Sequence, residues 1–160
     1  MATRDEDSSG GESSPAVTDR YRELWPGLVR LARLLTGSHT LGEDLAQEAF
    51  IGLIRSGDIA APEAYLRRSV VNASINLSKR RARERAHLLT LREEVSLPPE
   101  VDELWAIVEK LPVRQRAVLV LRYQLDLPEA EIARLLQCRP GTVKSLASRA
   151  LTHLRQEMTS

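Results

Sequence analysis

The stretch Leu135–Ser148, LLQCRPGTVKSLAS, contains Cys138, the only cysteine of the 160-residue chain, directly before an Arg-Pro-Gly sequence. A cysteine in a loop can be a reactive thiol, whereas a cysteine between two helices can be a small apolar group packed inside a turn. The first interpretation favours an enzyme, and the second favours a module that binds nucleic acid. The residues on either side of the stretch distinguish them.

Apolar residues flank the stretch at helical spacing on both sides. Before it, Ile132, Ala133 and Leu136 form the inner face of a short helix expected over 129–136. After it, a longer helix is expected over 140–156, and its inner face consists of Val143, Leu146 or Ala147, Ala150, Leu151 and Leu154. A short helix, a turn of about three residues and a long helix form a helix-turn-helix arrangement.

Cys138 lies between the two apolar faces, where a small apolar group would hold the turn in place. The position near a helix N-terminus could lower the pKa of a thiol. A nucleophilic thiol also needs a base, however, and the first histidine after Cys138 is His153, about four helical turns away. We therefore predict that Cys138 is structural.

The outward face of the second helix carries only side chains that can donate hydrogen bonds to phosphates or base edges. These residues are Arg139, Thr142, Lys144, Ser145, Ser148 and Arg149. In a helix-turn-helix, the second helix enters the major groove with its N-terminal residues at the bases. A solvated helix face normally mixes both signs of charge, so a face without acidic residues favours DNA binding.

The charge of the chain alternates in blocks although its net value is only +1. Residues 1–19 carry a net −4, residues 20–87 a net +5, residues 88–111 a net −4 and residues 112–160 a net +4. Two basic blocks around an acidic spacer are typical of two surfaces for polyanions, although a solvated surface of mixed charge is the plainer alternative.

The composition predicts an all-α protein. Aromatic residues make up only 4% of the chain, so the core must consist mainly of Leu, Val, Ile and Ala. No alternating strand pattern of useful length appears, and no apolar run approaches 18 residues. A single cysteine gives no internal disulfide, and no secretory signal is visible. We expect a soluble cytoplasmic protein without a membrane segment of its own.

Several signals divide the first half into helices. A leucine stripe from Leu24 to Leu35 predicts a helix that ends at Gly37 and is kinked or split at Pro26-Gly27. Thr40 and Glu43 have the spacing of a capping box at the start of the next helix. The inner face of that helix is expected to consist of Leu45, Ala49, Leu53 and Ile54.

A long helix is expected from Pro62, and its second part becomes basic from Lys79 to Arg85. Four prolines, at positions 99, 112, 128 and 140, each precede a helical pattern in the second half. The organisation predicted from these signals is a disordered acidic tail over 1–18, a helical domain over 19–91, a linker over 92–99 and a second helical domain over 100–157.

With the helix-turn-helix in place, DLPEAEIARLLQCRPGTVKSLASRALTHLR resembles region 4 of bacterial RNA polymerase sigma factors of the extracytoplasmic-function (ECF) group in the sigma-70 family. The preceding LPVRQRAVLVLRY resembles the lead-in helices of that region. In the first half, GEDLAQEAFIGL and PEAYLRRSVVNASINLSKRR resemble two helices of sigma region 2. The two sets of motifs occur in the family's order across a short linker.

The resemblance implies an alternative sigma factor that binds core polymerase and directs initiation at promoters with −35 and −10 elements. By resemblance, Asp44, Gln47 and Glu48 face the β′ clamp helices, and the second domain meets the β flap. The helix-turn-helix would bind the −35 element through the outward residues named above. The −10 contacts implied by the resemblance are Asn72, Asn76, Lys79, Arg80 and Arg81, and the loop over 56–61 would hold a flipped promoter base.

The implied mechanism is recognition without catalysis, cofactor or metal. An anti-sigma factor is a further candidate partner, because many relatives have one. The alternative is a helix-turn-helix transcriptional regulator that does not act as a sigma subunit, although residues 20–90 show neither the strands nor the acidic pocket of a receiver domain. An enzyme is disfavoured because His39, His87 and His153 are scattered and no nucleophile–base pair has usable spacing.

The chain departs from the family pattern at the turn. Many relatives carry glycine where Gln137 stands, and a left-handed conformation there would cost glutamine about 1–2 kcal/mol. Arg139 occupies a position where a small N-cap residue is common, so the cap is expected to be weaker. Leu146 stands where many relatives have a polar or basic residue. The −10 helix has Tyr65 as its only aromatic residue, without the tryptophans of many relatives.

Overall fold

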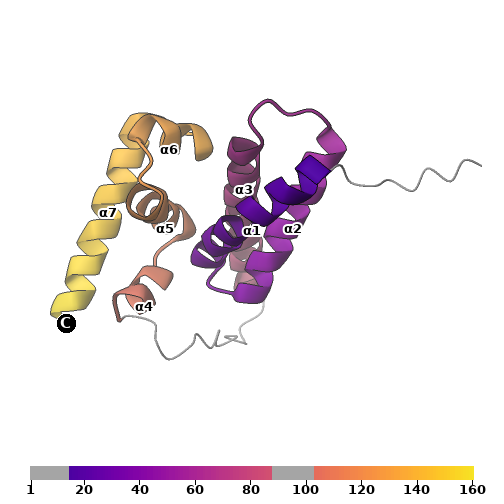
Figure 1. Cartoon of the computed structure of the whole chain (residues 1–160). Helices are drawn as coiled ribbons and strands as arrows, with labels where there is room; N and C mark the ends of the chain where they lie inside the picture. The colour runs from indigo at the N-terminus through magenta and orange to yellow at the C-terminus, as the bar shows by residue number, and fades with distance from the viewer. Residues whose placement is uncertain (1–14, 88–102) are drawn as a thin grey trace, which may run out of the picture.

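The computed structural model describes residues 15–87 and 103–160, all of which belong to helices or to the turns between them. Figure 1 shows two helical units side by side: α1, α2 and α3 form the first, and α4 to α7 form the second. Within the described residues no strand occurs, which agrees with the predicted all-α class. None of the described helices is both long enough and apolar enough to cross a membrane.

The first unit consists of three long helices: α1 (Pro15–Thr36), α2 (His39–Ser56) and α3 (Pro62–His87). Their shared core contains Leu28, Leu31 and Leu35 of the predicted stripe together with Phe50 of α2 and Val70 of α3, all buried, while the other leucines of the stripe, Leu24 and Leu34, are half-buried against it. Gly42 lets α1 and α2 approach closely, because a Cβ at this position would lie 2.9 Å from the backbone nitrogen of Arg33. Residues 15–18, assigned to the tail from the sequence, belong to α1, and the rest of the predicted tail lies outside the described residues.

The predicted kink or split at Pro26-Gly27 is wrong in one respect, because α1 is one helix with Pro26 inside it. Proline in a helix interior removes one hydrogen bond and costs about 3 kcal/mol. Pro26 and Gly27 both lie on the exposed side of α1, where water can satisfy the freed carbonyl. Burial of Leu28, Leu31 and Leu35 on the opposite side holds the helix together across this site.

The turn after α1 has the predicted glycine but not the predicted cap. Gly37 has φ of +75° and donates its N–H to the carbonyl of Arg33 at 2.8 Å, so it ends α1 in the left-handed conformation. The capping box at Thr40 is wrong: Ser38 is the N-cap of α2, and its Oγ accepts from the N–H of Leu41 at 3.3 Å. The two helices are closer together in sequence than the motif suggested, so Thr40 already lies inside α2.

The second unit contains three seven-residue helices followed by one long helix. They are α4 (Glu103–Glu109), α5 (Val113–Leu119), α6 (Glu129–Leu135) and α7 (Pro140–Thr159), and a π-helical turn, η1 (Val120–Gln124), continues α5. The four helices expected from the proline punctuation are therefore present over the described residues. The linker predicted over 92–99 lies outside them, as does Pro99.

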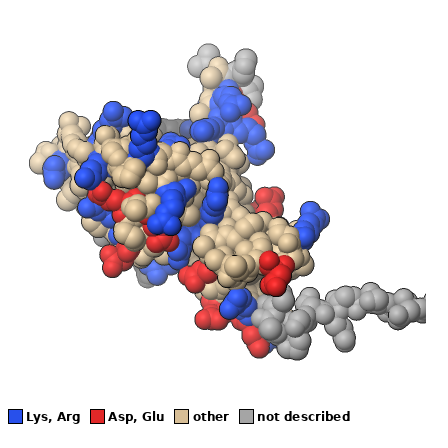
Figure 2. Space-filling model, turned by 90° about the horizontal axis from the view of Figure 1, so that it is seen from above, with Lys and Arg blue, Asp and Glu red and all other residues tan. Residues whose placement is uncertain are grey.

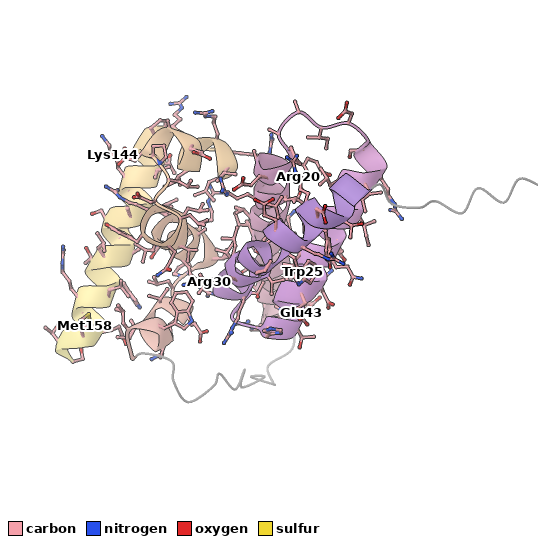
Figure 3. All side chains as sticks on the ribbon, in the orientation of Figure 1. Arg20, Trp25, Arg30, Glu43, Lys144 and Met158 are labelled. Carbon is pink, nitrogen blue, oxygen red and sulfur yellow. The ribbon has the colours of Figure 1, made fainter. Side chains whose placement is uncertain are left out.

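The two units pack against each other, and one apolar cluster includes buried residues of α1, α2, α3, α5, η1, α6 and α7. Among the described residues, three polar contacts also join the units. The Arg116 guanidinium donates to the carbonyl of Leu35 at 2.9 Å, Arg67 pairs with Glu131 at 3.2 Å, and Arg30 donates to Gln124 at 3.4 Å. Arg30 lies on the side of α1 that faces the second unit (Figure 3). We call this contact between α1/α3 and α5/η1/α6 the seam.

Candidate nucleic-acid interface

In the turn between α6 and α7, Gln137 adopts the left-handed conformation considered in the sequence analysis. This residue has φ of +51°, in the left-handed region, and the N–H of Cys138 donates to the carbonyl of Ala133 at 2.9 Å. This hydrogen bond belongs to a Schellman motif, which closes the end of a helix by reversing the chain at the left-handed residue. The helix-turn-helix is therefore formed with glutamine where a glycine would be less strained.

Cys138 is half-buried, which is less than the packed position predicted from the sequence. One side of the residue packs against the main apolar cluster. The other lines a shallow depression together with Ala130, Ala133, Arg134 and Gln137. Arg139 and Pro140, at the start of α7, complete the lining of this depression.

The face of α7 predicted to bind DNA is solvent-accessible. Arg139, Thr142, Lys144, Ser145, Ser148 and Arg149 are all exposed, whereas Val143, Ala147 and Ala150 are buried against the rest of the unit. Arg139 is the N-cap residue, and its side chain makes no capping hydrogen bond, as expected from its size. The free N–H groups of the first turn add to the positive character of this end of the helix.

Carboxylates approach this face at one point. Lys144 Nζ lies 4.0 Å from Glu129 Oε2, and Arg122 also reaches Glu129, at 3.4 Å. Among the described residues, no carboxylate oxygen lies within ion-pair distance of Arg139 or Arg149. Figure 2 views the molecule from above Figure 1 and shows basic side chains spread over much of this surface, with acidic side chains between them. Figure 3 shows Lys144 in the upper part of α7, near α6.

The second predicted DNA-binding set lies along α3. Asn76, Lys79 and Arg80 are exposed, while Asn72 and Arg81 are half-buried. The ion pair of Arg80 with Glu84 is long, at 3.8 Å, and both side chains are largely solvated, so it contributes little. The two asparagines lie one turn apart on the helix, as their spacing predicted.

The predicted polymerase-binding residues Asp44, Gln47 and Glu48 are exposed on α2. Ile51 and Ile54 continue along the same side of the helix and are exposed to 41% and 61%. The sequence interpretation placed Ile54 on the inner face, and this is wrong: positions 46, 49, 50 and 53 already fill the side toward α1 and α3. Large exposed apolar residues beside polar ones are typical of a protein-binding surface.

Sequence reasoning also missed Arg116, whose guanidinium is buried between the two units. It donates to the carbonyls of Leu35, Glu109 and Leu111, and its Nε has no partner among the described residues. Burial lowers the pKa of Arg116, and the carboxylate of Glu109 partly opposes this effect. No local sequence signal reveals its contact with the first unit, because the Leu35 carbonyl lies 81 residues earlier in the chain.

Comparison with known protein families gives a match for each of the two units. Residues 20–84 match the family model Sigma-70 region 2, and residues 102–154 match Sigma-70, region 4. The ECF RNA polymerase sigma factor SigE of Mycolicibacterium smegmatis is 30% identical over 93% of this chain, which spans 64% of that relative's length. The RNA polymerase sigma-E factor of Streptomyces avermitilis is 32% identical, over 83% of this chain and 79% of the relative.

Among solved structures, the sigma factor RpoE of Bartonella quintana, crystallised in complex with the anti-sigma factor NepR, is similar over 90% of this chain and 97% of that one. The TM-score is 0.73 at 21% identity, which shows a shared fold. The two family matches occur in order along the chain, and both relatives are named as RNA polymerase sigma factors. The chain belongs to the ECF RNA polymerase sigma factors of the sigma-70 family and is an alternative sigma factor for transcription initiation.

Proposed function

We propose that α7 binds the promoter −35 element in the major groove. The observation that carries this proposal is the exposed face of Arg139, Thr142, Lys144, Ser145, Ser148 and Arg149, which presents donors on a helix-turn-helix. Arginine and lysine at such positions donate to guanine O6 and N7 or to phosphates, while the hydroxyls can serve either. Arg149 lies three turns into α7, without a carboxylate partner among the described residues, and is free to meet DNA.

For the −10 element, the proposed surface is the outer side of α3. Asn72 and Asn76 would contact base edges, since an amide both donates and accepts hydrogen bonds. Lys79, Arg80 and Arg81 would neutralise backbone phosphates farther along the helix. The turn after α2, over residues 57–61, is adjacent to the start of α3 and is the proposed position of a flipped base.

Core RNA polymerase is the proposed protein partner of both regions. On region 2, Asp44, Gln47 and Glu48 would meet the β′ clamp helices, and region 4 would meet the β flap. Asp44 and Glu48 are exposed carboxylates on one face of α2, and they would attract basic side chains of the polymerase. An anti-sigma factor is a further proposed partner. The chain itself is proposed to act by recognition alone, without catalysis or a cofactor.

A transcription assay with purified components tests the proposal. With core polymerase and a promoter obtained by mapping start sites after induced expression, the wild-type chain should give promoter-dependent initiation. DNA binding without core binding would instead identify a helix-turn-helix regulator.

The −35 assignment is tested by Arg149→Ala, with Arg155→Ala as the matched control farther along the exposed side of α7. Loss of one such contact corresponds to about 1–3 kcal/mol, or roughly a fivefold to hundredfold loss of promoter affinity. Binding to core polymerase should not change in either variant. Equal effects of the two substitutions would show that Arg149 has no special role.

A further inference from the structure

One carboxylate lies among the cations of the helix-turn-helix. Glu129 is the first residue of α6, and its Oε1 accepts from Arg122 Nη1 of η1 at 3.4 Å. Its other oxygen, Oε2, lies 4.0 Å from the Nζ of Lys144, near the start of α7. Three consecutive segments, η1, α6 and α7, therefore meet at a single acidic side chain.

The structure holds the carboxylate more firmly than it holds the lysine. The side chain of Glu129 is 31% exposed and that of Arg122 is 40% exposed, whereas that of Lys144 is 72% exposed. The guanidinium of Arg122 also lies 5.7 Å from the centre of the Tyr123 ring, which favours a cation at this position. Arg122 thus fixes the carboxylate from one side, while the lysine on the other side keeps its freedom to move.

These contacts contribute little to the stability of the fold. Ion pairs of this length between solvated side chains are screened by water and salt. The packing of α6 against α7 depends instead on buried residues such as Ile132, Ala133 and Val143. What Glu129 does change is the charge beside one of the six donors proposed to meet the −35 element.

Glu129 acts on one part of the donor face only. Among the residues that the structure describes, no carboxylate oxygen lies within ion-pair distance of Arg139 or Arg149. These two arginines keep their full positive charge for DNA, whereas the charge of Lys144 is partly cancelled by its neighbour. The face therefore contains two kinds of cation.

An ammonium group that is paired with a carboxylate keeps most of its hydrogen-bonding capacity. It has three N–H donors, and one contact with Glu129 leaves two of them. Cancelling its charge weakens its attraction to phosphates, which is the same on every sequence. The remaining donors can still bind guanine O6 and N7, which not every base pair presents. Pairing therefore weakens the sequence-independent part of binding more than the sequence-dependent part.

We propose that Glu129 is a specificity-determining residue of the −35 interface, which directs Lys144 away from phosphates and toward base edges. It acts by cancelling part of the lysine charge and by holding the ammonium on the α6 side of α7. The same carboxylate withholds Arg122 from nearby phosphates. Glu129 itself needs no contact with DNA, so it is a positioning residue. This proposal rests on the proposed function of α7.

Binding of the complex of sigma factor and core polymerase to two DNA duplexes tests the role of Glu129. One duplex carries the mapped −35 element, and in the other only that element is scrambled. Fluorescence anisotropy gives the affinity for each duplex at several salt concentrations between about 50 and 200 mM.

Glu129→Gln should raise the affinity for the scrambled duplex about threefold to tenfold, because loss of one negative charge changes the local potential by about 1–2 kT. The slope of log affinity against log salt should become steeper by about 1, since one more phosphate is neutralised. The duplex with the intact element should gain less, because Lys144 loses its orientation. The ratio of the two affinities should therefore fall about threefold.

Glu157→Gln is the matched control. It removes the same charge from a pair of the same length, Lys110 Nζ to Glu157 Oε2 at 4.0 Å, at the far end of α7. The affinity ratio should not change in this variant. In a chain that already carries Lys144→Ala, Glu129→Gln should lower the ratio no further. Circular dichroism checks that every variant keeps its helices.

Glu129→Asp separates position from charge. It keeps the negative charge but withdraws the carboxylate by one methylene group, so it should lower the affinity ratio with little effect on the scrambled duplex. An unchanged ratio in this variant would show that only the charge matters and would overturn the positioning role.

Two further results would count against the proposal. Equal gains on both duplexes in Glu129→Gln would mean that the carboxylate merely repels DNA, and no change on either duplex would mean that it has no role. A wild-type complex that does not distinguish the duplexes would refute the proposed function of α7, and this proposal with it. A wild type that does distinguish them, with Glu129→Gln equally selective, would refute the role of Glu129 alone.

Discussion

Regions 2 and 4 are both all-helical, but they are built in different ways. Region 2 uses three helices of 22, 18 and 26 residues, whereas region 4 uses three helices of seven residues before its 20-residue last helix. The left-handed positions in region 2 are glycines, Gly37 and Gly57, while those in region 4 are Asp126 and Gln137. Region 2 thus depends on close helix packing, and region 4 depends on turns that carry strain.

The difference follows from what each region must position. Long helices bury enough apolar surface to hold their own orientation, so their turns can be the least strained available. A seven-residue helix buries little, and the turn after α6 must still orient α7. Strained turns persist when the surrounding packing determines them, as Ile132, Leu135 and Val143 do around the elbow.

The largest expected effect comes from the helix crossing in region 2. Gly42→Ala places a methyl group 2.9 Å from the backbone nitrogen of Arg33, so α1 and α2 must separate. We expect a loss of about 2–3 kcal/mol in the free energy of unfolding, measured with urea. Gly27→Ala is the control: its Cβ would meet nothing within 4 Å, and it should stabilise by about 0.5–1 kcal/mol.

A smaller effect of opposite sign is expected at the elbow of region 4. Gln137→Gly removes the strain of a Cβ at φ of +51° and should raise the unfolding free energy by about 0.5–1 kcal/mol. Gln137→Ala keeps the Cβ and should give no gain. Asp126→Gly should gain less than Gln137→Gly, because aspartate tolerates this conformation better. A loss of stability in Gln137→Gly would show that the glutamine side chain has a contact of its own.

Cys138→Ala tests how much the elbow depends on its sulfur. The side chain is half-buried and packs on the core from one side, so we expect a loss of less than about 1 kcal/mol. Initiation in the purified system should stay at the wild-type level. A folded but inactive variant would revive the interpretation of Cys138 as a reactive thiol.

The smallest effect concerns pH. Burial raises the pKa of Glu109 above its ordinary value near 4.5, although the Trp105 hydrogen bond and the charges of Arg116 and Arg33 partly oppose this. A raised pKa means that Glu109 contributes stability below about pH 4.5 and loses it as the pH rises through the raised pKa. Glu109→Gln should remove this dependence in urea titrations between pH 4 and 7. The difference should be below about 1 kcal/mol, because Glu109 is only partly buried and solvent screens the remaining interaction.

Most of the fold could be predicted from local sequence signals. Apolar spacing and proline positions gave each described helix its approximate range, because periodic burial and the missing proline N–H act over a few residues. The errors at Pro26-Gly27 and Thr40 arose where tertiary packing or a nearer cap replaced the local preference. Ile54 was misplaced because Leu53 and Ile54 are both apolar, and apolar spacing alone does not show that Ile54 lies at the edge of the inner face, where it is 61% exposed.

For the candidate site, the sequence could predict only which side chains are exposed to solvent. All six outward residues of α7 are exposed as expected, since helical geometry separates them from Val143 and Ala147. The seam was not predictable, because Arg116, Arg67 and their partners are 64 or more residues apart in the contacts that join the regions. Such pairings depend on how two folded units pack against each other, and the helical spacing of apolar residues contains no information about that packing.

The partner of the α1 end lies 81 residues farther along the chain than the carbonyl that it caps. A ribosome adds about 5–20 residues per second, so roughly 4–16 s separate the synthesis of Leu35 from that of Arg116. Throughout this interval the nascent region 2 exists without the residue that closes it. Each newly made region 2 therefore begins with the end of α1 uncovered, and this contact can form only after Arg116 has been synthesised.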